Sequence, residues 1–446
     1  MSTPSVSPDT AQLESPRDRR ELLGHPRGLA VLFLTETWAH FSYFGMQAML
    51  VYYMTKQLDF SQPKASALYG GYAAFAYLTP LLGGFLADRR LGQDRSVVLG
   101  GLIMALGHFA LAFEGAFFPG LFLVGLGNGF FLPATTTQVG YLYAEGDSRR
   151  DRAYSLYYMG VNIGGFLAPL ICGTIGELYG WHYGFAVAGV GMLIGLIFYL
   201  CNQDALPREV RSPRARKATA SPLGPDGRRA VLGLLGVAAL VILFRIAYEQ
   251  SGNTIALWAD GHTDRTVHLG DRAMIIPATW FQSINPLLIF CLTPVLTLWW
   301  TSQARSGREP APLRKMTIGS GLAGLAFLLM LGAARQAELQ GVASWAWLVG
   351  FFLLLTLAEL FVLPIGLSLF SQLAPPQIAS LMIGVWYMAK FAGSLAAGWL
   401  GTQWQLLPPS LFFSIGAAFA FAAALAFGLA STRSGARPRP LPDPQA

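Results

Sequence analysis

An apolar run near the start of the chain contains two ionisable side chains. Glu36 and His40 lie four residues apart in LAVLFLTETWAHFSYFGMQAMLVYYM (29–54), a spacing that places them on one face of a helix. Tyr43 and Gln47 extend the same polar stripe. A carboxyl group and an imidazole at this spacing can exchange protons, because histidine titrates near neutral pH and a neighbouring charge changes the pKa of a carboxylate. We expect the pair to face a cavity and to take up and release a proton, with Glu36 as the first candidate for the proton and His40 as the second.

Four more charges lie inside apolar runs. Arg245 and Glu249 are again four residues apart, Glu359 is alone in LLLTLAELFVLP, and Lys390 follows another apolar stretch. A charge at the centre of a membrane is costly and typically faces a cavity or a partner. A structural ion pair that locks helices together is the alternative interpretation, above all for Arg245 and Glu249. His108 has no ionisable neighbour on its helix, and we interpret it as a packing residue.

Uncharged polar residues also follow helical spacing in apolar runs. Tyr154, Tyr158 and Asn162 are spaced by four, Gln282 and Asn285 share TWFQSINPLL, and Trp386 precedes Lys390 by four. Prolines that interrupt these runs are Pro133, Pro169, Pro277, Pro286, Pro294 and Pro364. Each frees a backbone carbonyl that needs a partner or water. The polar stripes therefore indicate a cavity lined by several helices.

The composition is that of a membrane protein. Of 446 residues, 53% are hydrophobic and only 12% are charged, against about 25% charged in soluble domains. The cysteines Cys172, Cys201 and Cys291 lie in apolar runs without metal or disulfide spacing. No metal-ligand set, Ser/His/Asp arrangement or phosphate-binding glycine loop is evident, so we expect no enzyme activity, metal or cofactor.

Twelve apolar runs are long enough to cross a bilayer, which requires about 20 residues each. They cover 28–55, 66–88, 96–115, 119–144, 153–176, 181–201, 229–258, 273–301, 315–334, 342–371, 377–402 and 408–431. We expect an all-α polytopic membrane protein with two six-helix bundles, over 28–201 and 229–431. The expected remainder is a disordered tail over 1–27, a Pro- and charge-rich linker over 202–228 and a second tail over 432–446. In two-bundle transporters the substrate site lies between the bundles, near the middle of the membrane.

Basic residues indicate the orientation. Of the 31 lysines and arginines, 24 lie in the two tails and in alternate loops that would share one side of the membrane. By the positive-inside rule both termini are then cytoplasmic. The net charge of +7 is thus a signal of topology, and we expect no nucleic-acid partner.

Five segments resemble the proton-dependent oligopeptide transporter family of the major facilitator superfamily. GGFLADRRLG (83–92) is similar to the superfamily's loop after the second span. Family-like segments are YYMGVNIGGFLAPLI from Tyr157, AYEQSGNT from Ala247, IPATWFQSINPL from Ile276 and LAELFVLPIGLS from Leu357. The resemblance covers nearly all twelve spans and implies the major facilitator fold with proton-driven symport of short peptides.

The resemblance also implies roles for individual residues. Glu359 would bind the amino terminus of the peptide, while Asn162 and Asn285 would hydrogen-bond its backbone or termini. Tyr43 and Trp386 would wall the pocket, with Tyr158 beside them, and Glu249 would belong to a gating ion pair. Asp88 and Arg89 would brace the cytoplasmic gate. A buried zwitterion needs an anion at one end and a cation at the other, and Glu359 supplies the anion.

The chain departs from the family where cations are usual. The first span of the family has Glu-x-x-Glu-Arg-Phe, and here Ala39 and His40 replace the second Glu and the Arg. Gln47 replaces a family Arg, and Leu132, before Pro133, replaces a family Lys. Arg245 stands where Trp is usual, and Lys390 is a further cation. Our hypothesis is that Arg245 and Lys390 restore positive charge to the cavity.

Three functions remain open at this stage. Uptake of di- and tripeptides with protons is the main expectation, in a bacterial inner membrane and as a monomer. A shifted substrate, such as a modified peptide or amino-acid-like molecule, with weak or absent proton coupling is the second. A drug-exporting facilitator is the third, although the fifth span matches the Gly-x-x-x-Gly-Pro run of such exporters poorly.

Overall fold

The structure is a computed structural model that describes residues 21–22, 24–144, 147, 149–207, 224–270 and 272–434. Most of the two expected tails and of the expected linker lies outside the described residues. Glu21–Leu22 (β1) and His25–Pro26 (β2) pair as a short antiparallel ribbon before the first helix. The exact domain boundaries stay predictions.

The first half of the chain, called the N half here, contains the helices up to residue 205. Its elements are α1 (Arg27–Lys56), α2 (Gln62–Leu86), η1 (Ala87–Leu91), α3 (Gln93–Leu111), η2 (Glu114–Ala116), α4 (Phe117–Tyr141), α5 (Arg150–Ala168), η3 (Pro169–Gly173), α6 (Thr174–Tyr179), α7 (Trp181–Cys201) and η4 (Gln203–Ala205).

The second half, called the C half, begins at residue 225. Its helical elements are α8 (Pro225–Tyr248), η5 (Glu249–Gly252), α9 (Thr254–Gly261), η6 (Ala278–Ser283), α10 (Ile284–Arg305), α11 (Pro312–Gln340), α12 (Ala346–Leu373), η7 (Pro376–Ile378), α13 (Ala379–Gly401) and α14 (Pro409–Ser434). The strands β4 (Thr266–Leu269) and β5 (Arg272–Ile275) form an antiparallel hairpin, and β3 (Thr263–Asp264) pairs in parallel with β6 (Ala343–Ser344).

Each expected span falls on one helix or on a run of consecutive helices. Ten of these segments pass a test of length and apolar composition for crossing a membrane, and α1 and α2 do not. The polar stripe that begins at Glu36 explains the shortfall of α1. The expected span 273–301 began too early, because residues up to Ile275 belong to β5 and the helix starts at Ala278.

Two spans are interrupted along their length, and a third begins with a 3-10 helix. Pro169 begins the π-helical η3 between α5 and α6, and Glu249 begins the 3-10 helix η5 between α8 and α9. Pro277 precedes the 3-10 helix η6, which leads into α10. Such breaks expose backbone groups and are typical of helices that form transport sites.

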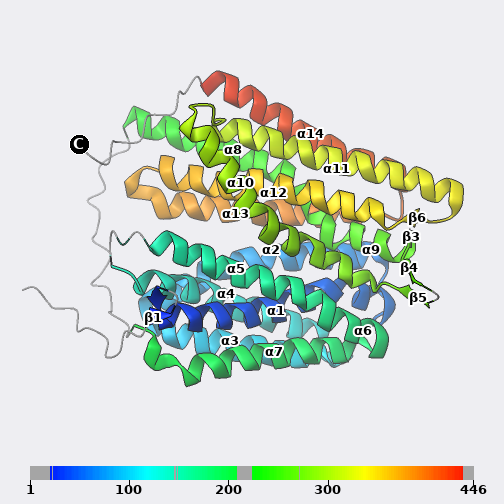
Figure 1. Cartoon of the computed structure of the whole chain (residues 1–446), viewed down its shortest axis with the longest axis horizontal. Helices are drawn as coiled ribbons and strands as arrows, with labels where there is room; N and C mark the ends of the chain where they lie inside the picture. The colour runs from blue at the N-terminus through cyan, green and yellow to red at the C-terminus, as the bar shows by residue number, and fades with distance from the viewer. Residues whose placement is uncertain are drawn as a thin grey trace, which may run out of the picture.

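The two halves lie side by side as separate helical layers (Figure 1). The C half has one large apolar core and a small one around Ile289 and Phe361, and one N-half core contains N-half residues alone. The other N-half core also takes in Ala256 and Ala278 of the C half. Between the halves, Gly70 of α2 meets Gly398 of α13 so closely that a Cβ on Gly70 would lie 2.4 Å from the Gly398 Cα. Glycine at this crossing allows the two backbones to touch.

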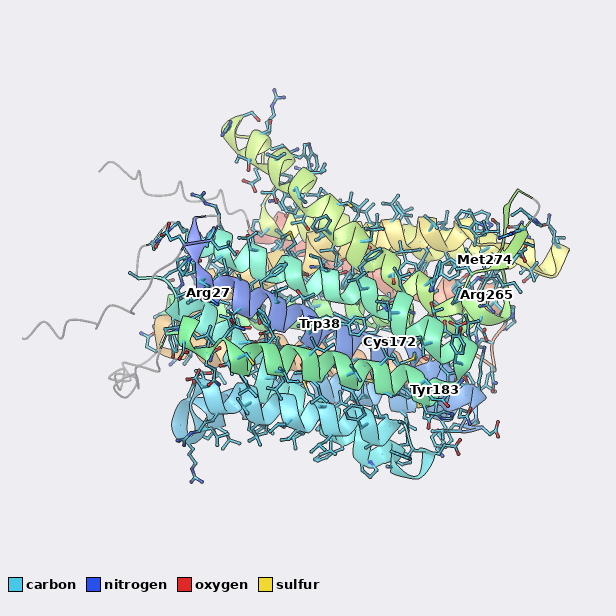
Figure 2. The ribbon with its side chains drawn as sticks, turned by 60° about the horizontal axis from the view of Figure 1, so that its bottom comes forward. Arg27, Trp38, Cys172, Tyr183, Arg265 and Met274 are labelled. Carbon is cyan, nitrogen blue, oxygen red and sulfur yellow. The ribbon has the colours of Figure 1, made fainter. Side chains whose placement is uncertain are left out.

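The two ends of the molecule differ. The strand β1 and the end of α14 at Ser434 lie at one end, called the terminal end, and the β4–β5 hairpin lies at the other, called the hairpin end (Figure 1). Arg27 and Arg265 mark these opposite ends, with Trp38 and Cys172 between them (Figure 2). Hydrogen bonds that join the halves near the hairpin end are Tyr52 to Ala256, Gln62 to Gly401, Ser66 to Asn253 and Trp280 to Thr174.

Candidate functional site

Glu36 and His40 form a pair inside the N half. Glu36 is fully buried, and its Oε1 lies 3.2 Å from Nδ1 of His40 on the next turn of α1. Thr135 of α4 donates its hydroxyl to Glu36 Oε2 at 3.1 Å, and its oxygen lies 2.9 Å from the Tyr157 hydroxyl of α5. The carboxyl group is therefore held by three helices of one half.

Thr135 and Tyr157 were not among the residues that we selected from the sequence. Thr135 lies one turn after Leu132, where the family carries its Lys. A hydroxyl from the same helix thus meets Glu36 in place of an ammonium group. The run Thr135–Thr136–Thr137 after a proline was the available signal, because hydroxyl groups in an apolar helix need partners.

Arg245 and Glu249 form an ion pair at the end of α8. Arg245 is 1% exposed, and its Nη2 contacts Glu249 Oε1 and lies 3.3 Å from the Ser394 hydroxyl of α13. Its guanidinium also lies 4.9 Å from the centre of the Tyr77 ring, which belongs to the N half. Glu249 therefore neutralises Arg245 within one helix.

Lys390 of α13 has a different environment. Its Nζ lies 5.3 Å from the ring centre of Tyr77, 5.5 Å from that of Tyr387 and 5.9 Å from that of Trp386. Across the described residues, no carboxylate lies within 4 Å of this ammonium group. Aromatic faces attract a cation without neutralising its charge. Lys390 is thus a cation that remains available to an anionic ligand.

Glu359 of α12 is the anion of the C half that corresponds to the cation Lys390. Its Oε2 accepts a hydrogen bond of 2.8 Å from Asn285 Nδ2, and the same amide donates to Thr356 at 3.0 Å. Glu359 makes no ion pair with any residue that the structure describes. The C half thus presents one unpaired anion and one unpaired cation on neighbouring helices.

The remaining residues that we selected lie in less polar surroundings. Asn162 is 5% exposed and donates to the Tyr158 carbonyl on its own helix, whereas Tyr158 is 47% exposed. Tyr43 stacks on Tyr72 at 6.3 Å. Trp386 is fully buried against Phe370. Its ring also lies near a charged group, the Lys390 ammonium, at 5.9 Å.

Asp88 and Arg89 lie on the π-helical turn η1 after α2. Asp88 accepts a hydrogen bond of 2.9 Å from Gln93, and the Arg89 guanidinium lies 4.2 Å from the ring centre of Phe85. These contacts stay within the N half. Their role at a gate stays a prediction.

Two further positions complete the comparison with the sequence. Gln47 donates to the Tyr69 hydroxyl at 3.2 Å, so the position where the family has an Arg is occupied by a neutral hydrogen-bonded pair. His108 is fully buried in α3 beside Gly189, and neither of its ring nitrogens has a hydrogen-bond partner among the described residues. Tyr77, which we did not select, is the N-half residue that meets both C-half cations.

A chain of four charges connects the halves at the hairpin end. Lys56 contacts Asp260 at 2.7 Å, Arg265 contacts Asp260 at 3.3 Å, and Arg265 also contacts Glu177 at 3.5 Å. Glu177 in addition accepts hydrogen bonds from the backbone amides of residues 278 and 279 at 3.0 and 2.8 Å. We call Lys56, Asp260, Arg265 and Glu177 the charge chain. Its links cross twice between the N half and the C half.

Comparisons with known proteins agree with the resemblance. The family model described as Major Facilitator Superfamily matches residues 32–302, and the one described as POT family matches residues 210–410. The chain is 34% identical to the peptide transporter YePEPT of Yersinia enterocolitica, over 86% of this chain and 88% of that protein. It is 33% identical to the uncharacterized transporter YclF of Bacillus subtilis, over 89% of this chain and 91% of that protein.

A solved structure extends the agreement to the fold. The crystal structure of a peptide transporter POT in complex with sulfate superposes with a TM-score of 0.86 at 30% identity, over 96% of this chain and 99% of that one. The expected major facilitator fold is thereby confirmed. The chain is a multi-pass membrane protein, and its family and fold are those of transporters rather than enzymes.

Proposed function

Because the chain belongs to the POT family of the Major Facilitator Superfamily, we propose that it takes up di- and tripeptides together with protons by alternating access. The observation that carries the proposal is the unpaired state of Glu359 and Lys390, among the described residues, on adjacent helices of the C half. A short peptide is a zwitterion with one charge at each end. Its burial between two bundles is favourable only if both charges meet a partner.

In this proposal Glu359 receives the amino terminus and Lys390 receives the carboxylate. Asn285 fixes the Glu359 carboxylate from α10, so that the anion is oriented before the peptide arrives. Arg245 contributes less than we expected from the sequence, because Glu249 already neutralises it. The lost family cations are then replaced chiefly by Lys390. Tyr77, which touches both cations from the N half, would sense whether a peptide is bound.

Proton coupling is assigned to Glu36 and His40. The two groups are close enough to share a proton, and the hydroxyl groups of Thr135 and Tyr157 give the network donors that can turn toward or away from the carboxylate. A change of protonation here changes the charge buried between α1, α4 and α5. Such a change favours one arrangement of the helices over another only if the two arrangements solvate the pair differently.

The charge chain is proposed as the gate that closes one side of the pathway. If both termini are cytoplasmic in a bacterial inner membrane, the hairpin end faces outward. The hydrogen bonds and ion pairs at that end then describe a state closed to the outside. Binding of the peptide and protons would have to weaken the charge chain before the site could open outward.

A carrier with a shifted substrate is the second candidate, and one observation favours it. Gln47 and Leu132 stand at two positions where the family usually has a cation, and the Gln47 side chain is hydrogen-bonded to the Tyr69 hydroxyl. A substrate with one carboxylate and few backbone amides would suit such a site. Weak or absent proton coupling would accompany this alternative if the Glu36–His40 pair does not titrate during transport.

The test is uptake into liposomes that contain the purified protein and a pH dye. We expect dialanine added from outside to acidify the lumen when a proton gradient is imposed, and Glu359→Gln to abolish uptake. Glu338→Gln, an exposed carboxylate on α11, is the matched control and should transport as the wild type does. Uptake at the same rate with and without the proton gradient would support a carrier without proton coupling. If no short peptide is taken up, the carrier with a shifted substrate would be supported instead.

A further inference from the structure

A groove that the transport site does not use lies between α2 and α4. It is lined by Ala67, Leu68, Gly71 and Phe75 of α2 and by Phe118 and Phe122 of α4, among others, and has a volume of about 250 Å³. The lining is almost entirely apolar, and Phe118 and Phe122 are each 53% exposed. On a membrane-spanning helix pair, such a surface faces lipid.

Aromatic pairs flank the groove along its length. Phe75 and Phe122 stack with ring centres 5.5 Å apart, and Phe75 also lies against Gly125. Nearer the hairpin end, Phe60 stacks on Phe118 with ring centres 6.2 Å apart. The groove is thus a shallow, open depression along the helix pair, flanked by aromatic rings.

Lys64 provides a cation at the end of this groove that is nearer the hairpin end. Lys64, Leu68, Gly71 and Phe75 follow i, i+4, i+7 and i+11, so that they share one face of α2. The Lys64 ammonium lies 3.5 Å from the centre of the Phe60 ring. Its side chain is exposed, and it makes no ion pair with a described carboxylate. The first turn of α2 adds the positive end of the helix dipole at the same place.

We propose that this groove binds one anionic diacyl phospholipid, with an acyl chain between α2 and α4 and the phosphate at Lys64. The apolar groove matches the acyl chain of such a molecule, and the unpaired cation at the membrane boundary matches its phosphate. A soluble anion would leave the groove unfilled, and a zwitterionic lipid would bring its own cation to Lys64. The proposal does not depend on the transported substrate.

The groove lies beside a close contact between the two halves. Gly71 borders the groove, and the preceding residue, Gly70, forms the close crossing with Gly398 of the C half. A lipid in the groove therefore contacts the helix that the other half touches most closely. Occupancy should change the rate at which the halves rock, in addition to the stability of the protein.

The experiment is native mass spectrometry of the purified full-length protein with dioleoyl phosphatidylglycerol or dioleoyl phosphatidylcholine. We expect one phosphatidylglycerol to be retained in preference to phosphatidylcholine, and Lys64→Gln to reduce its retention about fivefold, the effect of about one basic residue at a lipid surface. Lys64→Arg should restore retention. Arg335→Gln, an exposed arginine on α11, is the control and should change nothing.

A second variant tests the groove itself. A Cβ on Gly71 meets no atom within 4 Å, so Gly71→Leu should fill the groove without disturbing the helices and should reduce retention at least as much as Lys64→Gln. Gly236→Leu is the matched control, because the space around Gly236 is equally open. If Gly71→Leu fails to fold, the Lys64 series decides.

The proposal is overturned by equal retention of both lipids or by retention that Lys64→Gln leaves unchanged. Displacement by the deacylated headgroup, glycerophosphoglycerol, at the same concentration would also overturn it, since the site would then bind phosphate alone.

Discussion

The two halves of the molecule hold their buried carboxyl groups Glu36 and Glu359 in different ways. In the N half, Glu36 is held by His40 and Thr135, and the polar contacts of its carboxyl group with described residues come from its own half. In the C half, Glu359 and Lys390 lie on adjacent helices, and each lacks an ionic partner among the described residues. A carboxyl group that is held within its own half is suited to store a proton, whereas a pair of charges without ionic partners is suited to bind a zwitterion. In the proposed function, the N half would then couple protons and the C half would recognise the charges of the substrate.

Neutralising the C-half charges should have the largest effect. Glu359→Gln or Lys390→Gln should reduce dialanine uptake at least about 30-fold, because removing one partner of a desolvated charge pair costs roughly 2–5 kcal/mol. Initial rates of uptake of labelled dialanine into liposomes measure this. Arg335→Gln and Glu338→Gln, at exposed positions of α11, are the controls. Transport that survives either C-half substitution would remove the basis for this half of the comparison.

Changing the N-half pair should affect coupling and leave exchange intact. Glu36→Gln should lower proton-driven accumulation to the level reached without a gradient, while exchange of labelled for unlabelled peptide continues, since the C-half charges are untouched. His40→Gln should act in the same direction with a smaller effect. Loss of exchange in Glu36→Gln would show that the N half also binds substrate.

The contact between the halves should have an intermediate effect. Tyr77→Leu removes the ring that lies near both Arg245 and Lys390, a loss of roughly 0.5–2 kcal/mol for a cation–π contact. We expect peptide affinity to fall by about 2- to 30-fold, and Tyr77→Phe, which keeps the ring, to stay closer to the wild type. Equilibrium binding of dialanine measures both variants. Equal affinities of the Leu and Phe variants would exclude the ring as the contact that matters.

The charge chain should contribute least. Arg265→Gln breaks two of its three links and should weaken closure at the hairpin end by about 1 kcal/mol or less, with the effect shrinking at high salt. The measurement is the rate at which an impermeant maleimide labels Ala256→Cys, a buried position of α9 that packs into the N-half core, in a background where Cys172 is alanine and Cys201 and Cys291 are serine. We expect up to about fivefold faster labelling. Arg272→Gln, at an exposed position of β5, should leave the rate unchanged, and equal rates in both variants would show that Arg265 does not hold the gate.

Contacts within one helix could be predicted from the sequence, and most contacts between helices could not. Glu36–His40 and Arg245–Glu249 follow from a spacing of four, and the positions of the spans follow from hydropathy. Thr135 meets Glu36 across 99 residues of sequence, and Tyr77 meets cations of the other half. Such meetings depend on how the helices pack, which no local pattern records. Trp386 shares a helix face with Lys390 as its spacing indicates, yet its ring is fully buried among apolar neighbours.

The central claim is that Lys390 binds the peptide carboxylate and Glu359 the amino terminus. Isothermal titration of dialanine, dialanine amide and N-acetyl-dialanine against the wild type, Lys390→Gln and Glu359→Gln tests it directly. We expect dialanine amide to bind the wild type more weakly than dialanine does, and to bind Lys390→Gln as well as dialanine does. N-acetyl-dialanine should likewise bind the wild type more weakly than dialanine, and bind Glu359→Gln equally well. If Lys390→Gln still prefers the free carboxylate by the wild-type factor, another cation binds it and the claim is wrong.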